Sequence, residues 1–192
     1  ADRDVERFPR TFGAADERGG DDLDQNLGQD AGDRLSRDLA ADAQELARAG
    51  WQLRKLAVDR SGRVDLDDVK AALETPTGIV STMLANNETG VIQNVAAVGE
   101  LARARRAWMH TDAVQALGKI PVDFAALNVH AMSVSAHKIY GPKGIGALYV
   151  RRKPRVRVRE QIDGGGHERG MRSGTLNVTG IVGFGKAAEL CK

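Results

Sequence analysis

Three short apolar segments, each followed at once by polar residues, constrain the fold of this 192-residue chain more than any other feature. They cover residues 79–84, residues 108–111 and a run that ends near Val134, and each has the length and composition of a buried strand. A helical pattern over residues 95–106 separates the first from the second. Strand, helix, strand is the order of a parallel sheet with right-handed crossovers, so we predict an α/β fold whose parallel-rich sheet is wrapped by helices.

Four further elements are predicted around these segments. They are a strand over residues 51–58, a short helix that begins after Asp65, a strand over residues 145–150 and a helix over residues 182–190. Together with the three apolar segments they are distributed along the chain from residue 51 to residue 190.

The residues that follow the three apolar segments are the ones able to do chemistry. Asn87 follows the first segment, Asp112 the second, and Ser135, His137 and Lys138 the third. The ends of strands in open α/β sheets are where ligands bind, because the loops there converge on a crevice. A lysine held in such a crevice loses hydration, which favours the neutral amine that attacks a carbonyl group. We therefore interpret Lys138 as a candidate Schiff-base lysine.

Four motifs in order resemble those of the cysteine desulfurases, which are pyridoxal 5'-phosphate (PLP) enzymes of the class V aminotransferase type. The motifs are Ala85-Asn-Asn-Glu-Thr-Gly90, His110-Thr-Asp-Ala-Val-Gln115, Ser133-Val-Ser-Ala-His-Lys138-Ile-Tyr-Gly-Pro-Lys-Gly144 and Gly164-Gly-Gly-His-Glu-Arg-Gly-Met-Arg-Ser-Gly-Thr175. The resemblance runs from about residue 45 to residue 191. It implies part of the large domain of the PLP-dependent transferase fold.

The resemblance also implies a role for each matching residue. Lys138 would bind PLP as a Schiff base and shuttle the substrate proton, and Asp112 would pair with the pyridine nitrogen, which makes the ring an electron sink. Gln115 and Asn87 would lie at the phenolic edge of the ring, whereas Ser135 and His137 would hold the phosphate. Thr175 would reach the phosphate of the neighbouring subunit in a homodimer.

Each of these residues, taken alone, also fits a purely structural role. Asp112 is a candidate helix N-cap, Asn87 a turn residue and His137 a core histidine. Lys138 could be a solvated charge and Gln115 a helix-surface residue. Ser135 could be a strand-end hydroxyl and Thr175 a helix cap.

Charge divides the chain in two. Residues 1–45 hold thirteen acidic residues against six arginines, a net −7, whereas residues 46–192 hold thirteen against twenty-two basic residues, a net +9. Large apolar residues are sparse up to Ser36 and follow no period, so we predict that residues 1–45 are disordered or loosely packed. The resemblance fails in the same segment, because the four histidines start at residue 110 and the family's ring-stacking histidine has no counterpart.

Several features lead us to expect a truncated member of the family. The first residue is Ala1, and the family's persulfide-forming cysteine and its small domain would lie beyond residue 192. Cys191 is therefore expected to be a buried or tail thiol rather than that cysteine.

The sequence also limits the classes of partner. No metal site is expected, since the histidines have no metal-ligand spacing, and no apolar run approaches membrane-spanning length. The arginine-rich segment 151–159 is predicted to be an edge strand rather than a nucleic-acid surface, because no aromatic platform accompanies it. A single cysteine fits a reducing compartment such as the cytoplasm.

The function that the resemblance implies is removal of sulfur from L-cysteine, giving alanine and an enzyme persulfide for iron–sulfur cluster assembly. An iron–sulfur scaffold protein would then be a possible partner. Two different functions stay open: that of another class V PLP enzyme, such as a selenocysteine lyase or an aminotransferase, and that of a non-catalytic remnant.

Overall fold

The structure of the protein, a computed structural model, describes residues 11–15, 46–48 and 50–191. The chain divides into two compact units. The first comprises the chain up to Asp112 together with Asp123–Val129, and the second comprises Ala113–Val122 and the chain from His130 onward.

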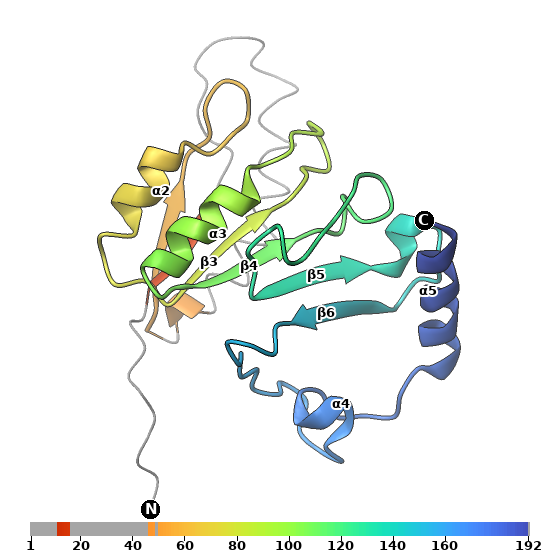
Figure 1. Cartoon of the computed structure of the whole chain (residues 1–192). Helices are drawn as coiled ribbons and strands as arrows, with labels where there is room; N and C mark the ends of the chain where they lie inside the picture. The colour runs from red at the N-terminus through yellow and green to blue at the C-terminus, as the bar shows by residue number, and fades with distance from the viewer. Residues whose placement is uncertain (1–10, 16–45, 49, 192) are drawn as a thin grey trace, which may run out of the picture. The chain divides into compact units, whose positions relative to one another are not determined.

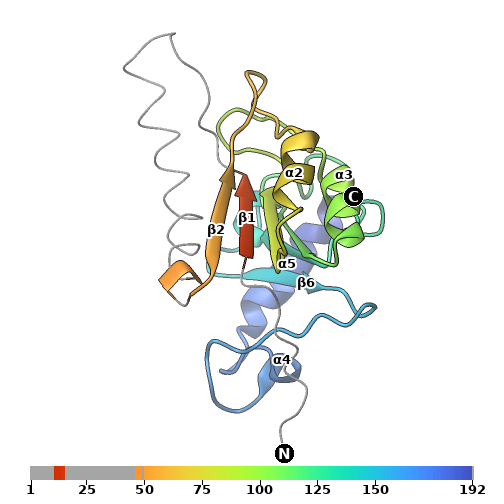
Figure 2. The same cartoon turned by 90° about the vertical axis from the view of Figure 1, so that its left-hand side faces the viewer.

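The first unit is built on parallel strands in the order β2-β1-β3-β4, of which Figure 1 labels β3 and β4. The strands are β1 (Thr11–Ala15), β2 (Gln52–Leu56), β3 (Ile79–Met83) and β4 (Trp108–Asp112). Figure 2 shows β1 running beside β2, and its other edge pairs with β3. This mostly parallel arrangement confirms the predicted α/β fold class.

Strand β1 is the part of the acidic segment that the structure describes. It pairs on both sides, so its backbone hydrogen-bonding groups are used by two neighbours. The rest of that segment, residues 1–10 and 16–45, lies outside the described residues, and the prediction of a boundary at residue 45 stays a prediction.

Helices α2 (Leu66–Ala72) and α3 (Val95–Ala104) lie side by side on one face of this sheet (Figure 1). They connect β2 to β3 and β3 to β4, and right-handed crossovers that advance in the same direction place their helices on the same face. The predicted cap Asp65 is confirmed, since its carboxylate accepts the Asp67 amide at 2.7 Å. Asn94 caps α3 by accepting the Ala97 amide at 3.3 Å.

Apolar side chains from both helices and from the facing side of the sheet form the core of the first unit. Each is at most 8% exposed: Val69, Leu73, Val80, Val95, Val98, Ala102 and Met109. Burying a valine, leucine or methionine side chain contributes about 1.5–3 kcal/mol, so this layer stabilises the unit.

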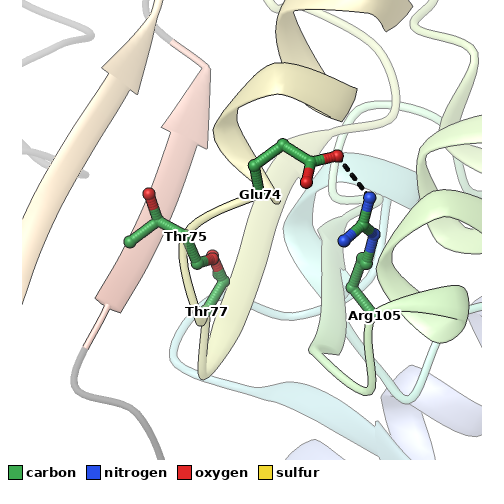
Figure 3. Close-up of polar contacts among 4 residues, drawn as sticks. All are labelled: Glu74, Thr75, Thr77 and Arg105. Carbon is green, nitrogen blue, oxygen red and sulfur yellow. Dashed lines mark hydrogen bonds and ion pairs between the residues drawn. The ribbon is translucent and has the colours of Figure 1, made fainter.

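The ends of α2 and α3 are joined by a surface ion pair between Glu74 and Arg105 (Figure 3). Their side chains are 60% and 45% exposed, so the pair contributes about 0.2–1 kcal/mol at most. Beside it, the Thr77 hydroxyl donates to the Thr75 carbonyl at 2.8 Å and closes the turn that leads into β3 (Figure 3).

The second unit contains an antiparallel hairpin. Strand β5 (Ala131–Ser135) is followed by the 3-10 helix η1 (Ala136–Ile139) and by β6 (Gly146–Val150), with Ser135 opposite Gly146. The connection between the strands is ten residues long, too short for the usual parallel crossover, so β6 returns antiparallel. A short helix α4 (His167–Gly170) and a longer helix α5 (Val178–Leu190) follow, and α5 packs against η1.

Two sequence predictions are corrected in this unit. The arginine-rich segment is not an edge strand: residues 151–159 contain a turn and irregular backbone without strand assignment. Helix α5 begins four residues earlier than predicted because Asn177 caps it, accepting the Gly180 amide at 3.0 Å. Among the residues that the structure describes, no helix is long and apolar enough to span a membrane.

Candidate functional site

In the first unit, two predicted site residues lie at the carboxyl ends of neighbouring parallel strands. Asp112 is the last residue of β4 and faces Met83 of β3, and Asn87 lies in the loop that follows β3. The strand order reverses between β1 and β3, because the chain passes from β1 out to β2 and returns to β3 on the other side. Ligands of open α/β sheets bind at the carboxyl ends of the strands at such a reversal.

A buried asparagine organises the loop that carries Asn87. The Asn86 side-chain oxygen accepts the backbone amides of Glu88 and Thr89, each at 2.8 Å, and the Thr89 hydroxyl at 3.1 Å. Asn86 is 7% exposed, whereas Asn87 is exposed. Asn86 therefore shapes the loop, and its neighbour presents an amide to solvent.

Two hydrogen bonds to the β3 segment fix the backbone around Asp112. The Leu84 amide donates to the Asp112 carbonyl at 2.7 Å, and the buried Thr111 hydroxyl donates to the Thr82 carbonyl at 2.9 Å. Asp112 ends a strand and its successors form turns, so the interpretation as a helix N-cap is wrong. What remains is a half-buried carboxylate on a rigid strand end.

A histidine lies on the same face of β4 as Asp112. Residues two apart on a strand point to the same side, which places His110 next to Asp112 along the strand. The His110 Nδ1 atom is 2.7 Å from the hydroxyl oxygen of Ser81, its register partner on β3. Burial lowers the pKa of His110 from its usual value, and the negative charge of Asp112 partly offsets this.

In the second unit, three predicted residues come together at the end of β5. The Ser135 hydroxyl oxygen lies 2.8 Å from His137 Nδ1, and Lys138 follows in η1. His137 is exposed, so the interpretation as a core histidine is wrong, and Lys138 is half-buried. A hydroxyl, an imidazole and an ammonium within four residues form a donor set suited to an anion such as a phosphate.

Close backbone approaches hold this donor set in place. A Cβ atom at Gly146 would lie 2.7 Å from the Val134 carbonyl oxygen, and one at Gly141 would lie 2.9 Å from the Ala136 carbonyl oxygen. The Gly141 amide donates to that same Ala136 carbonyl at 2.9 Å. Only glycine fits at these two positions without moving the hairpin.

The remaining two predicted residues lie elsewhere in the second unit. The Gln115 side-chain oxygen accepts from the Lys119 ammonium at 3.0 Å, and Thr175 is exposed in the loop before α5. That loop is fastened by Ser173, whose hydroxyl donates to Glu160 at 2.9 Å and accepts the Gly166 amide at 3.1 Å.

Three residues that shape these loops and strand ends were not singled out from the sequence: Ser81, Asn86 and Ser173. Asn86 carried a usable signal, because an asparagine followed closely by polar residues and a Thr-Gly pair is typical of an Asx turn. Ser81 interrupts an apolar run, which hints at a polar partner. The partners of Ser173 lie 7 and 13 residues away, at no repeating spacing.

The described residues contain no group of three His, Cys, Asp or Glu side chains arranged to hold a metal ion. Cys191 is half-buried at the end of α5 and borders an open hollow of about 390 Å³ together with Leu117, Ile120 and Ile139. Cys191 lies in a different segment of the chain from Ser135, His137 and Lys138 at the end of β5.

The chain matches the family model described as aminotransferase class V over residues 39–192. It is 60% identical over 147 residues to the cysteine desulfurase IscS of Anaeromyxobacter dehalogenans, an alignment that covers 77% of this chain and 36% of that protein. The chain thus spans about a third of the length of the curated relatives it matches.

Solved structures of similar proteins extend the likeness to the fold. A NifS-like protein superposes with a TM-score of 0.82 and 36% identity, covering 97% of this chain and 46% of that one. A structure described as SspA in complex with cysteine gives a TM-score of 0.79 and 30% identity, covering 93% of this chain and 47% of that one.

Proposed function

Because the chain belongs to the class V aminotransferase family, whose members depend on PLP, we propose that it carries the cofactor-binding part of a cysteine desulfurase. The observation that carries this proposal is the donor set at the end of β5, where Ser135, His137 and Lys138 gather a hydroxyl, an imidazole and an amine. The resemblance predicts the family's Schiff-base lysine within this set.

The chemistry of the donor set fits PLP. The cofactor has a phosphate, an aldehyde and a basic pyridine nitrogen, and when bound it acts as a sink for the electrons of the substrate's α-carbon. Ser135 and His137 would hold the phosphate through O–H and N–H donors. Lys138, which is half-buried, would hold the aldehyde carbon through its Nζ atom.

The other predicted residues would orient the ring and move protons. Asp112 would keep a proton on the pyridine nitrogen through its negative charge, and Gln115 and Asn87 would hydrogen-bond the phenolic edge. After substrate entry, the amine of Lys138 would accept the α-proton of the amino acid as a general base.

For the substrate we propose L-cysteine, with alanine and an enzyme persulfide as products. The names of the curated relatives and the cysteine complex of the SspA structure support this choice. We further propose a homodimer, in which the exposed Thr175 of one copy reaches the phosphate bound by the other. We propose an iron–sulfur scaffold protein as the sulfur acceptor, and a cytoplasmic location.

Borohydride reduction of the purified chain with excess PLP tests the cofactor proposal. We expect a reduced adduct on Lys138, located by peptide mass spectrometry and lost in Lys138→Ala. The matched control is Lys143→Ala, which removes an exposed lysine from the same hairpin and should leave the adduct unchanged. A wild-type chain without an adduct at Lys138 would disprove cofactor binding through this residue.

A further inference from the structure

On the sheet face that carries Asp112, two residues not assigned to the cofactor form a polar pair. Ser81 and His110 are register partners on β3 and β4, with 2.7 Å between the hydroxyl oxygen and Nδ1. Ser81 is 7% exposed, and a buried hydroxyl needs a hydrogen-bond partner. His110 precedes Asp112 by two residues on β4, so the two side chains point to the same side of the strand.

The geometry points to Ser81 and His110 as positioning residues for Asp112: the Ser81 hydroxyl donates to His110 Nδ1, which leaves the His110 proton on Nε2, and the neutral imidazole orients the Asp112 carboxylate. This inference rests on the proposed function, in which that carboxylate pairs with the pyridine nitrogen.

The tautomer follows from the hydrogen-bonding capacity of the two groups. A neutral imidazole has one N–H and one acceptor nitrogen, and the Ser81 hydroxyl has one proton to donate. If Nδ1 accepts that proton, the N–H of the ring is on Nε2. Asp112 acts on His110 electrostatically, and a carboxylate favours an N–H directed toward it.

A neutral histidine suits this position better than a charged one. In the proposed site, the Asp112 carboxylate pairs with the protonated pyridine nitrogen. A positively charged His110 beside it would compete with the pyridine for that negative charge. Because His110 is half-buried, the charged form of its ring is disfavoured. The Nε2–H of the ring would then attract the Asp112 carboxylate electrostatically while leaving its negative charge for the cofactor.

Hydrogen bonds between β4 and the β3 segment make such restraint effective. Thr111 donates to the Thr82 carbonyl and Leu84 donates to the Asp112 carbonyl, so the main chain at Asp112 has little freedom. What is left to orient is the side chain itself, and His110 is the neighbour on the same strand face.

The first arm of the test needs no cofactor. In the unloaded chain, nitrogen-15 NMR of the histidine rings, assigned with His110→Gln, should show the His110 proton on Nε2. Ser81→Ala and Asp112→Asn should each shift the His110 ring nitrogens, and Ser81→Thr should restore the wild-type pattern. Thr82→Val, which removes the neighbouring hydroxyl from the other face of β3, is the matched control and should leave the ring unchanged.

The second arm measures PLP binding and the absorbance of the Lys138 adduct. His110→Gln should weaken PLP binding roughly tenfold, the effect of losing a polar contact to a charged group. Ser81→Ala, which removes the partner that orients the ring, should weaken binding in the same direction, and both variants should shift the absorbance maximum. Circular dichroism confirms that each variant is folded.

The outcomes separate this inference from the proposed function. A proton on Nδ1, or ring nitrogens unaffected by Ser81→Ala or Asp112→Asn, overturns the inference even if PLP binds. Wild-type PLP affinity and absorbance in both Ser81→Ala and His110→Gln overturn the positioning role. Absence of any adduct in the wild-type chain disproves the proposed function. The positioning role of Ser81 and His110 then fails as well, because it rests on that function. The NMR result still decides how Ser81 and His110 are hydrogen-bonded.

Discussion

His110 shows how the fold changes the chemistry of a single residue. Its ring is half-buried on β4 and contacts the Ser81 hydroxyl. Burial lowers the pKa of His110 below its usual value of 6.5, and the charge of Asp112 partly offsets the effect. The folded protein therefore keeps His110 neutral in a pH range where the unfolded chain already binds a proton.

The free energy of unfolding should consequently decrease as the pH falls. His110 contributes fully above its unfolded pKa of about 6.5, and this contribution is lost as the pH falls through the lowered folded-state pKa. Urea unfolding at successive pH values measures the slope, which should be smaller in His110→Gln over the same window. Equal slopes in the two proteins would show that another group is responsible.

At the scale of single residues, the sequence identified side chains through motifs and missed those that act through space. Ser135, His137 and Lys138 were predicted together because they are adjacent in the chain, and the 2.8 Å contact between Ser135 and His137 is a local one. Ser81 and His110 are separated by 28 intervening residues, and only the β3–β4 register brings them together.

At the scale of elements, α3 and α5 use glycine in opposite ways. A Cβ atom at Gly99 in α3 would lie 2.9 Å from Asn128 Cβ and 3.0 Å from the Leu127 and Asn128 carbonyl oxygens. Gly185 in α5 is exposed, and a Cβ atom there would meet nothing within 4 Å. The first glycine permits close packing of the helix on a loop, whereas the second has no packing role.

The two positions should therefore respond oppositely to alanine. Gly99→Ala is expected to destabilise the protein by about 1–3 kcal/mol, because backbone atoms must move to admit the methyl group. Gly185→Ala is expected to stabilise it by up to about 1 kcal/mol through helix propensity. Chemical denaturation of both variants measures the differences, and equal effects at the two positions would contradict the packing difference.

Most elements were predictable because each carries its own period and its own ends. The strands at 79–83 and 108–112 and helix α3 fall within two residues of the predicted bounds. Strand β1 was not predicted, since a five-residue central strand depends on pairing with β2 and β3 more than on its own pattern. The sequence also left the direction of β6 open, because apolar residues alternate in the same way along parallel and antiparallel strands.

At the scale of the whole molecule, the proposed cofactor should act as a stabilising ligand. A ligand that binds only the native state adds RT ln(1 + [L]/Kd), or about 2.7 kcal/mol at a concentration of a hundred Kd. PLP should therefore raise the unfolding temperature of the wild-type chain, with a much smaller effect in Lys138→Ala.

Pyridoxine 5'-phosphate, which has the ring and phosphate but no aldehyde, separates the two parts of this effect. It should stabilise the wild-type chain less than PLP, because Lys138 has no carbonyl carbon to bond. Equal stabilisation by both compounds would mean that phosphate and ring contacts alone hold the cofactor.

The sequence by itself determined the α/β class and most element bounds, and it led to the proposed members of the candidate site, because periodicity, caps and motifs are properties of neighbouring residues. Only the tertiary structure decided that β1 is a central strand, that the strand order reverses beside the Asn87 loop, and that Ser81 contacts His110. These features depend on which strands pair and in which register, and that choice is made by backbone hydrogen bonds and packing between segments far apart in the chain.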